Sequence, residues 1–132
     1  TPPPAPATPT SRIYNVTFDQ FYGRTSSYSV VVGGAPFIYA SGLSKDGKDT
    51  YGNTTCTKLV IQVVIRDASS VTNADLQISQ GQINPPVITA THGKIAEHAF
   101  PLTPGRPLII TNVGQDSIFW NGFFQCATAN GR

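Results

Sequence analysis

Apolar and polar residues alternate in short segments along most of this chain, and such alternation is typical of β-strands. The clearest segment is residues 57–66, TKLVIQVVIR, in which aliphatic side chains at alternate positions from 59 to 65 share one face. Val60 and Val64 fall on the other face. Because both faces are apolar, we expect this strand at the centre of a sheet.

Nine segments share this character, and glycine, proline and asparagine fall between them. The predicted strands are residues 13–18, 28–32, 37–40, 57–66, 75–79, 87–91, 95–100, 108–113 and 117–126. Residues 91–94 fit a tight hairpin turn. No segment has a convincing helical period, so at most one helical turn is expected, within residues 68–76. The chain is therefore predicted to be all-β, an antiparallel β-sandwich or barrel of about eight to nine short strands.

The first ten residues, TPPPAPATPT, carry no charge and no large apolar side chain. Five of them are prolines, which favour extended polyproline II and make a semi-rigid spacer. We interpret residues 1–12 as a hinge or linker. Residues 13–132 are interpreted as a single β domain that the spacer holds away from the rest of a longer protein.

Charge and hydropathy exclude several classes of function. Charged residues make up 12% of the chain, the formal net charge is +2, and the lysines and arginines are scattered. No basic run indicates a nucleic-acid surface. No apolar stretch reaches the roughly 20 residues of a membrane span. We therefore expect neither nucleic-acid binding by this domain nor insertion into a membrane.

The two cysteines, Cys56 and Cys126, lie 70 positions apart. A disulfide between them would close a long loop and contribute roughly 4 kcal/mol to stability. Two free buried thiols are an equal alternative, and the residues alone leave both open. A zinc site is excluded, because no histidine lies near either cysteine.

Residues 41–55, SGLSKDGKDTYGNTT, form the longest polar segment and are interpreted as a loop ahead of the central strand. Long polar loops on rigid sheets commonly carry binding function. We expect this loop to form an exposed attachment surface that includes Lys45, Lys48 and Tyr51.

Two carboxylates in the same segment, Asp46 and Asp49, lie three positions apart around Gly47. Clustered carboxylates suit a hard cation such as calcium. The further acidic ligands of a calcium loop are absent, and the flanking lysines oppose a cation. A solvated turn is the favoured interpretation and calcium the weaker one; no other cofactor is expected.

Aromatic residues occupy both faces of the last predicted strand: Phe119 and Phe123 on one, Trp120 and Phe124 on the other. One set therefore needs a cover beyond its own sheet, which could be a second sheet, a partner subunit or a sugar ring. The core of a two-sheet sandwich is the first interpretation. A subunit contact comes next, since interfaces are rich in aromatic residues, and these four are the candidate interface residues.

No catalytic motif is present. His92 and His98 are the two histidines of the chain, and neither lies in a recognisable motif beside a nucleophile. A Gly-x-Ser-x-Gly elbow is also absent. The carboxylates fall mostly beside turns, where solvated residues are common, so we expect no enzymatic activity.

Two glycosylation sequons occur, Asn15-Val16-Thr17 and Asn53-Thr54-Thr55. They matter only if the chain passes through a secretory compartment. Asn15 falls inside a predicted strand, so Asn53, in the long polar segment, is predicted to be the better acceptor.

The hinge TPPPAPATPT, the segment RIYNVTFDQFYGR and the end FFQCATANGR, on a low-charge all-β domain, resemble a viral protruding domain. The group is the C-terminal protruding domain of nodavirus-type capsid proteins from shrimp and prawns, and the resemblance covers the whole chain. It implies a preceding jelly-roll shell domain, a hinge that lifts this domain, and homodimeric spikes that attach to a host-cell receptor. It also implies a virion-surface location after assembly in the cytoplasm, with Cys56 and Cys126 reduced and both sequons unused.

A secreted carbohydrate-binding module is the competing interpretation. Pro/Thr spacers also tether sugar-binding modules, and surface aromatic residues stack on sugar rings. Such a module is expected to be an extracellular monomer, often with a Cys56–Cys126 disulfide. A capsid spike is expected to be a homodimer with free thiols.

Overall fold

The computed structural model describes residues 12–22, 28–114 and 116–131, and this part of the chain is all-β with one short helix. The elements are β1 (Tyr14–Thr17), α1 (Phe18–Tyr22), β2 (Ser29–Val32), β3 (Ala35–Ile38), β4 (Ser41–Leu43), β5 (Lys48–Tyr51), β6 (Cys56–Val64), β7 (Asn73–Ser79), β8 (Val87–Thr91), β9 (Ala96–Pro101), β10 (Leu108–Asn112) and β11 (Ile118–Cys126). Each of the nine predicted segments overlaps a strand, so the predicted fold class is confirmed. Residues 1–11 of the predicted linker lie outside the described residues.

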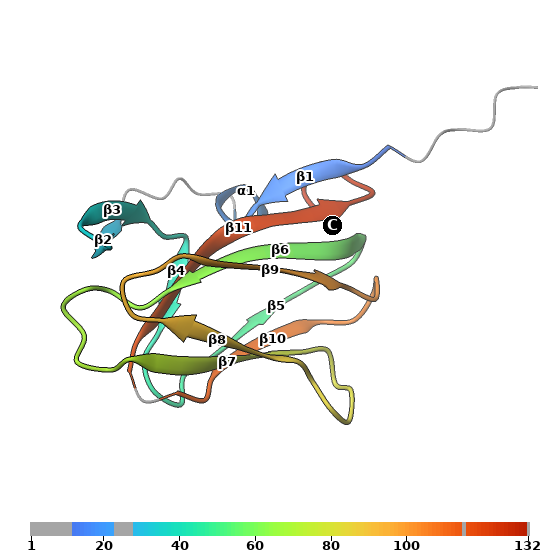
Figure 1. Ribbon diagram of the computed structural model, residues 1–132. Coiled ribbons are helices and arrows are strands. Elements are labelled where there is room, and N and C mark those ends of the chain that lie inside the picture. Colours follow the sequence, from blue (N-terminus) through green and yellow to red (C-terminus); the bar gives the residue numbers. More distant parts are fainter. Residues whose placement is uncertain (1–11, 23–27, 115, 132) are drawn as a thin grey trace, which may run out of the picture.

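Two sheets face each other as the layers of a sandwich (Figure 1). The larger has the order β1-β11-β6-β9, and the smaller has the order β5-β10-β7-β8, with antiparallel pairing throughout. β4 also joins the larger sheet, because it pairs with the first part of β11 while β1 pairs with the last part. β6 lies between β11 and β9, which confirms its predicted central place.

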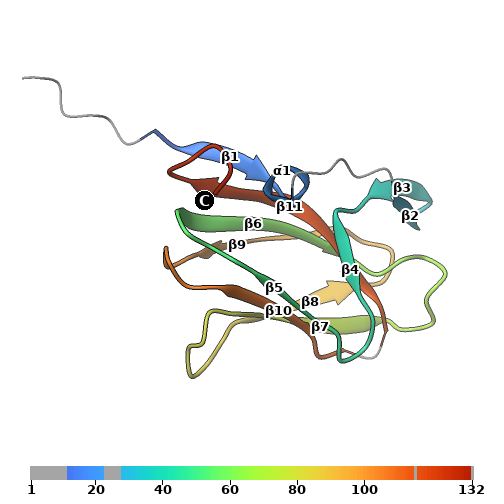
Figure 2. The ribbon, with the colours of Figure 1, turned by 180° about the vertical axis from the view of Figure 1, so that it is seen from behind.

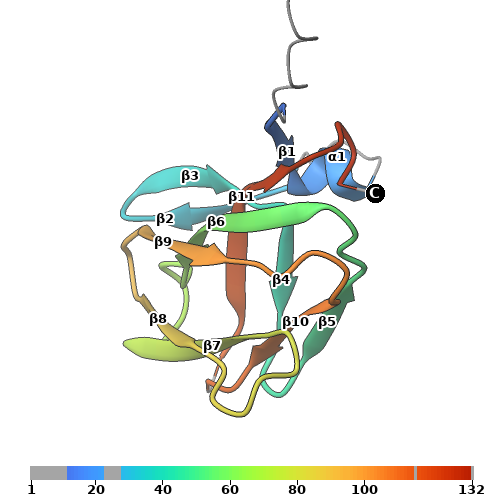
Figure 3. The ribbon, with the colours of Figure 1, turned by 90° about the vertical axis from the view of Figure 1, so that its right-hand side faces the viewer.

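The segment expected as one long loop, residues 41–55, instead contains two short strands, β4 and β5. β4 pairs with β11 of the larger sheet and β5 pairs with β10 of the smaller one, so this segment crosses from sheet to sheet (Figure 2). On the opposite side β8 and β9 make the second crossing, and in the end-on view the strands surround the core (Figure 3). The loop prediction was wrong because β4 and β5 are short and mostly polar, which hides their alternation.

The core between the sheets contains the aromatic residues of β11. Trp120 is fully buried and Phe124 is 1% exposed, and the Phe124 ring lies 4.8 Å from Phe18 and 4.9 Å from Phe21. Tyr51 of β5 is 2% exposed within the same cluster. The sandwich-core interpretation is thus confirmed for Trp120 and Phe124. Their assignment to an interface, and that of Tyr51 to an exposed attachment surface, are corrected.

Helix α1 replaces the helical turn that was expected within residues 68–76. Its first turn is closed by a reciprocal capping box: the Gln20 N–H donates to Thr17 Oγ1 at 3.1 Å, and the Thr17 N–H donates to Gln20 Oε1 at 3.0 Å. Residues 68–76 hold a turn and the start of β7 instead. The Thr-x-x-Gln spacing is the signal that could have located the helix.

A separate hairpin, β2–β3, packs on the face of the larger sheet that points away from the core; we call this face the outer face. Val32 and Phe37 of the hairpin form a second small cluster with Val64 of β6. Phe119 of β11 packs against the same cluster. The predicted sandwich therefore carries a partial third layer over one end of its larger sheet.

Cys56 and Cys126 lie opposite each other on β6 and β11 and form a disulfide with an S–S distance of 2.03 Å. Of the two alternatives that the sequence left open, the structure has the bonded one. The reduced thiols implied by the viral resemblance are therefore corrected. The bond joins the two longest strands at the end where β1 also pairs with β11.

Candidate functional site

The hairpin leaves part of the outer face open, and strand register places the side chains of this part in rows. One row is apolar in its centre and runs Ala99, Val60, Phe123, Thr17 across β9, β6, β11 and β1. The next row toward the hairpin is polar and runs Glu97, Gln62, Asn121. The row on the other side, Pro101, Lys58, Gln125, Asn15, is mostly polar. The central row is therefore apolar but mostly covered, since Val60 is 9% exposed and Phe123 is partly buried, and polar rows lie on both sides of it.

Of the four predicted aromatic interface residues, Phe123 is the one on this open surface, where it is partly buried. Phe119 points to the same side but lies beneath the hairpin, with its ring 4.7 Å from that of Tyr39 and 5.9 Å from the Arg66 guanidinium. Phe119 therefore holds the hairpin on the sheet. Its predicted place at an interface is corrected to this packing role.

Asn121 and the carboxylate of Asp67 attach the hairpin at two points. The Asn121 side chain donates from Nδ2 to the Ile38 carbonyl at 2.9 Å. Asp67 accepts from the Gly33 N–H at 2.8 Å and from the Gly34 N–H at 2.9 Å, so it clamps the turn between β2 and β3. Both glycines have positive φ, 59° and 79°, as a two-residue hairpin turn requires.

These turn N–H groups, with a smaller contribution from His92, hold the pKa of Asp67 below its ordinary value. The charged carboxylate therefore stabilises the docked hairpin at pH values above about 4, the ordinary unfolded value, and this contribution is lost as the pH falls through the lower folded value. We expect amide hydrogen exchange at Gly33 and Gly34 to speed up below pH 4, relative to core amides.

Asp67→Asn should abolish most of that pH dependence, because the amide keeps one acceptor and does not titrate in this range. Asp46→Asn, on an exposed turn away from the hairpin, is the matched control and should leave the pH profile unchanged. Equal pH profiles for wild type and Asp67→Asn would contradict the clamp.

The exposed side of the hairpin is mostly apolar and carries no charge. Val31 is 53% exposed and Ile38 is 56% exposed. Pro36 lies directly opposite Val31, and Ser29 lies opposite Ile38. We call these four residues the hairpin patch. Sequence reasoning missed it, since the alternation of β2 does not show which face meets the sheet.

The carboxylates expected to suit calcium lie on different backbone elements. Asp46 occupies an exposed turn with a φ of 62°, whereas Asp49 in β5 accepts a hydrogen bond from the Tyr51 hydroxyl at 3.0 Å. Burial raises the pKa of Tyr51, so that hydroxyl stays protonated and donates. Among the described residues, no three His, Cys, Asp or Glu side chains gather as a metal site. Calcium stays an untested prediction; the neighbouring Lys45 and Lys48 are exposed, as expected.

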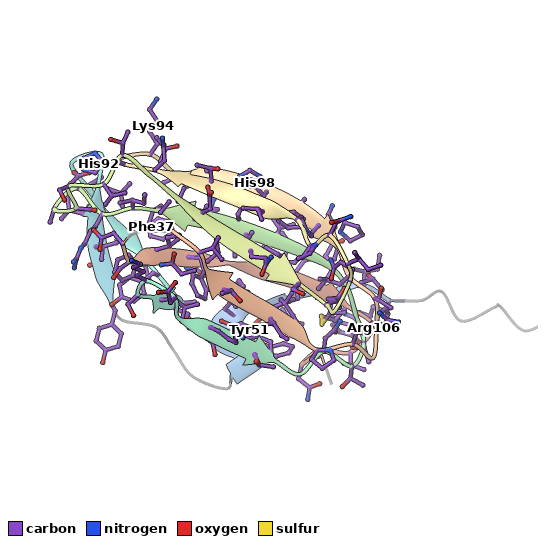
Figure 4. All side chains as sticks on the ribbon, turned by 90° about the horizontal axis from the view of Figure 1, so that it is seen from below. Phe37, Tyr51, His92, Lys94, His98 and Arg106 are labelled. Atoms are coloured by element: carbon purple, nitrogen blue, oxygen red, sulfur yellow. A yellow bond between two sulfur atoms is a disulfide. The ribbon has the colours of Figure 1, made fainter. Side chains whose placement is uncertain are left out.

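The histidines do not share a site. His92 lies at the hairpin end of the sandwich, where Nε2 donates to the Asp67 carbonyl at 2.9 Å. His98 lies along β9, with its ring stacked on Phe100 at 6.2 Å. Figure 4 shows the two rings apart and Arg106 at the opposite end of the molecule.

The sequon preference is corrected for the folded chain. Asn53 is 5% exposed, and its Nδ2 donates to the Cys56 and Thr103 carbonyls at 3.1 Å each, while its Oδ1 accepts from the Cys56 N–H at 2.9 Å. Asn15 is exposed on the outer face. A glycan would therefore fit at Asn15 and not at Asn53.

Comparison with known proteins leaves the family open. No family model matches the chain, and no curated protein matches it. One similar solved structure is a family GH115 4-O-methyl-α-glucuronidase with specificity for decorated arabinogalactans, at 15% identity and a TM-score of 0.43. The match covers 93% of this chain but 18% of that protein, and a likeness this weak carries no argument. In the described residues, no helix has the length and apolar character to span a membrane.

Proposed function

We propose that this domain is a non-enzymatic surface module of a small non-enveloped virus capsid, which pairs with a second copy to form a spike and attaches the virion to its host cell. The hairpin patch carries this proposal. It presents Val31, Pro36 and Ile38 to solvent, with Tyr28, 69% exposed, directly before β2. Trp120 and Phe124, the earlier candidates for this contact, are excluded by burial.

A second copy of the chain is the partner that suits this patch. A two-fold contact places one patch against itself, so a charge close to the two-fold axis would lie near the same charge of the second copy. The hairpin patch has no charged residue. The hairpin is also clamped by Asp67 and Asn121, so it offers a fixed shape and little ordering is needed on contact.

Val31→Asp is expected to weaken self-association at least about tenfold, because pairing through the patch would bury two unpaired carboxylates, one from each copy. Sedimentation equilibrium over a dilution series measures this change. The matched control is Val113→Asp, since Val113 is 50% exposed, close to the 53% of Val31, and lies outside the hairpin.

Ile38→Asp provides an independent second substitution on the other strand of the hairpin. Equal weakening by Val113→Asp would show a general charge effect and would contradict the assigned contact. A wild-type chain that stays monomeric at the highest concentration would overturn the pairing itself.

A secreted carbohydrate-binding module is the second candidate, and the disulfide is the observation that favours it. Disulfides persist in oxidising compartments and are rare in the cytoplasm, where such capsids assemble. In this setting the domain would be extracellular and monomeric, and Asn15 would be available to a glycan. The sedimentation experiment separates the two candidates, because a monomer supports this one.

A further inference from the structure

A shallow depression of about 280 Å³ lies on the outer face, directly beside the hairpin. Phe123 and Val60 form its apolar floor, and Gln62, Glu97, Asn121 and Thr17 border it. Its volume is slightly below the ~300 Å³ at which pockets for drug-sized ligands begin, so it suits a ligand of one ring.

The order of side chains across the strands matches the chemistry of a pyranose. Phe123 lies opposite Val60, and one row away Asn121, Gln62 and Glu97 lie side by side across β11, β6 and β9. Neighbouring strands are ~4.8 Å apart, so these three groups can reach neighbouring hydroxyls of one sugar. The electron-rich face of an aromatic ring attracts the C–H groups on the apolar face of a pyranose.

The polar side chains around the depression differ in how many hydrogen bonds they already make within the protein. Within the described residues, the Gln62 and Glu97 side chains make no hydrogen bond or ion pair. Asn121 is held in place, because its Oδ1 accepts from the Gly122 N–H at 2.8 Å and its Nδ2 donates to Ile38. The second Nδ2 hydrogen remains for a ligand. The depression thus combines one fixed donor with two available groups.

Charge narrows the ligand further. The bordering residues include one carboxylate, Glu97, and no lysine or arginine. An acidic sugar such as a sialic acid would bring its own carboxylate near Glu97, and the two like charges would repel each other. Lys58 lies on the same face, in the row on the other side of Val60, but it does not line the depression. A neutral sugar avoids this repulsion and can donate hydroxyl hydrogens to the Glu97 oxygens.

We propose that the depression binds one neutral pyranose ring of a glycan, with Phe123 stacked on the sugar and with Gln62, Glu97 and Asn121 bound to its hydroxyls. This inference rests on the proposed attachment function and names its ligand class. It also fits the secreted alternative, since both require a glycan-binding surface.

Saturation-transfer NMR with methyl pyranosides of glucose, galactose, mannose and N-acetylglucosamine tests the proposal, with sialyllactose as the acidic comparison. We expect transfer to the C–H protons of at least one neutral pyranoside. Phe123→Ala should weaken that binding about tenfold, because it removes the stacking platform. Glu97→Gln, at an exposed position, should weaken binding without disturbing the fold.

Tyr28→Ala is the matched control, because it removes an aromatic ring that is 69% exposed and does not line the depression. It should leave sugar binding unchanged. The proposal is overturned if no neutral pyranoside receives transfer, if Tyr28→Ala lowers binding as much as Phe123→Ala, or if sialyllactose binds more tightly than every neutral sugar.

The same NMR measurement on Val31→Asp separates this inference from the pairing proposal. That substitution leaves the depression intact, so the monomeric variant should still bind sugar. Loss of pairing with retained sugar binding supports both proposals. A wild-type chain that pairs through the hairpin patch and binds no neutral pyranoside refutes the sugar site alone.

Discussion

Gly122→Ala is expected to lower the free energy of unfolding by about 4 kcal/mol, through overpacking combined with a strained backbone. Gly122 has a φ of 151°, a conformation that L-residues with side chains rarely adopt. An added Cβ would lie 2.1 Å from the Val60 carbonyl oxygen and 3.0 Å from the Ile61 Cα. Both atoms belong to the backbone of the central strand β6, so neither can move aside as a flexible side chain would.

Two matched glycine substitutions divide this expected loss into its parts. Gly105→Ala tests the backbone contribution alone, because Gly105 has a φ of 84° and no atom lies within 4 Å of the place that its new methyl group would take. Gly52→Ala meets neither problem and should be close to neutral. Urea denaturation measures the free energy of unfolding of all three variants, and an unchanged m-value shows that the differences are differences in stability. A loss for Gly122→Ala no greater than that for Gly105→Ala would contradict the proposed clash with β6.

The strands could be predicted because their signal is local. Alternation in residues 57–66 placed β6 at the centre of a sheet, and the turn residues placed the ends of most strands. β4 and β5 were missed for the converse reason: their identity depends on pairing with β11 and β10, which lie far away in the sequence. The sequence of a short polar segment does not show whether it pairs with a distant strand.

The candidate site was harder to predict than the fold. Aromatic residues on both faces of β11 correctly indicated that other elements pack against both faces. The composition did not show which of the two faces meets the second sheet. Trp120 and Phe124 face the core, Phe119 packs against the hairpin, and Phe123 alone of the four lines the open depression. A period of two assigns residues to a shared face without assigning that face to the inside or the outside.

Buried polar residues show the same limit. Asn112 is fully buried. Its Nδ2 donates to the Leu43 carbonyl at 2.9 Å and to the Asp116 carbonyl at 2.7 Å. Its Oδ1 accepts from the Gly114 N–H at 2.9 Å. It therefore ties the β4–β5 turn region to the segment before β11. In the sequence it is an ordinary asparagine close to a glycine, because its partners come together only in the folded chain.

The double substitution Cys56→Ala and Cys126→Ala is expected to cost about 4 kcal/mol of stability, because the lost cross-link closes a loop of 70 residues and restricts the unfolded chain. Alanine suits both positions, since Cys56 is fully buried and Cys126 is 2% exposed, and no new polar group is then buried. Thermal and urea unfolding of the oxidised wild type and the double variant measure the difference.

Reduction of the wild type supplies the control for packing. If the bond carries the effect, a reductant should bring the wild type close to the double variant and leave the variant unchanged. A wild type that is indifferent to reductant, with two thiols titratable after unfolding in oxidising buffer, would contradict the disulfide. That result would also remove the observation that favours the secreted module, whereas a stable bond would require the capsid candidate to acquire it after leaving the reducing cytoplasm.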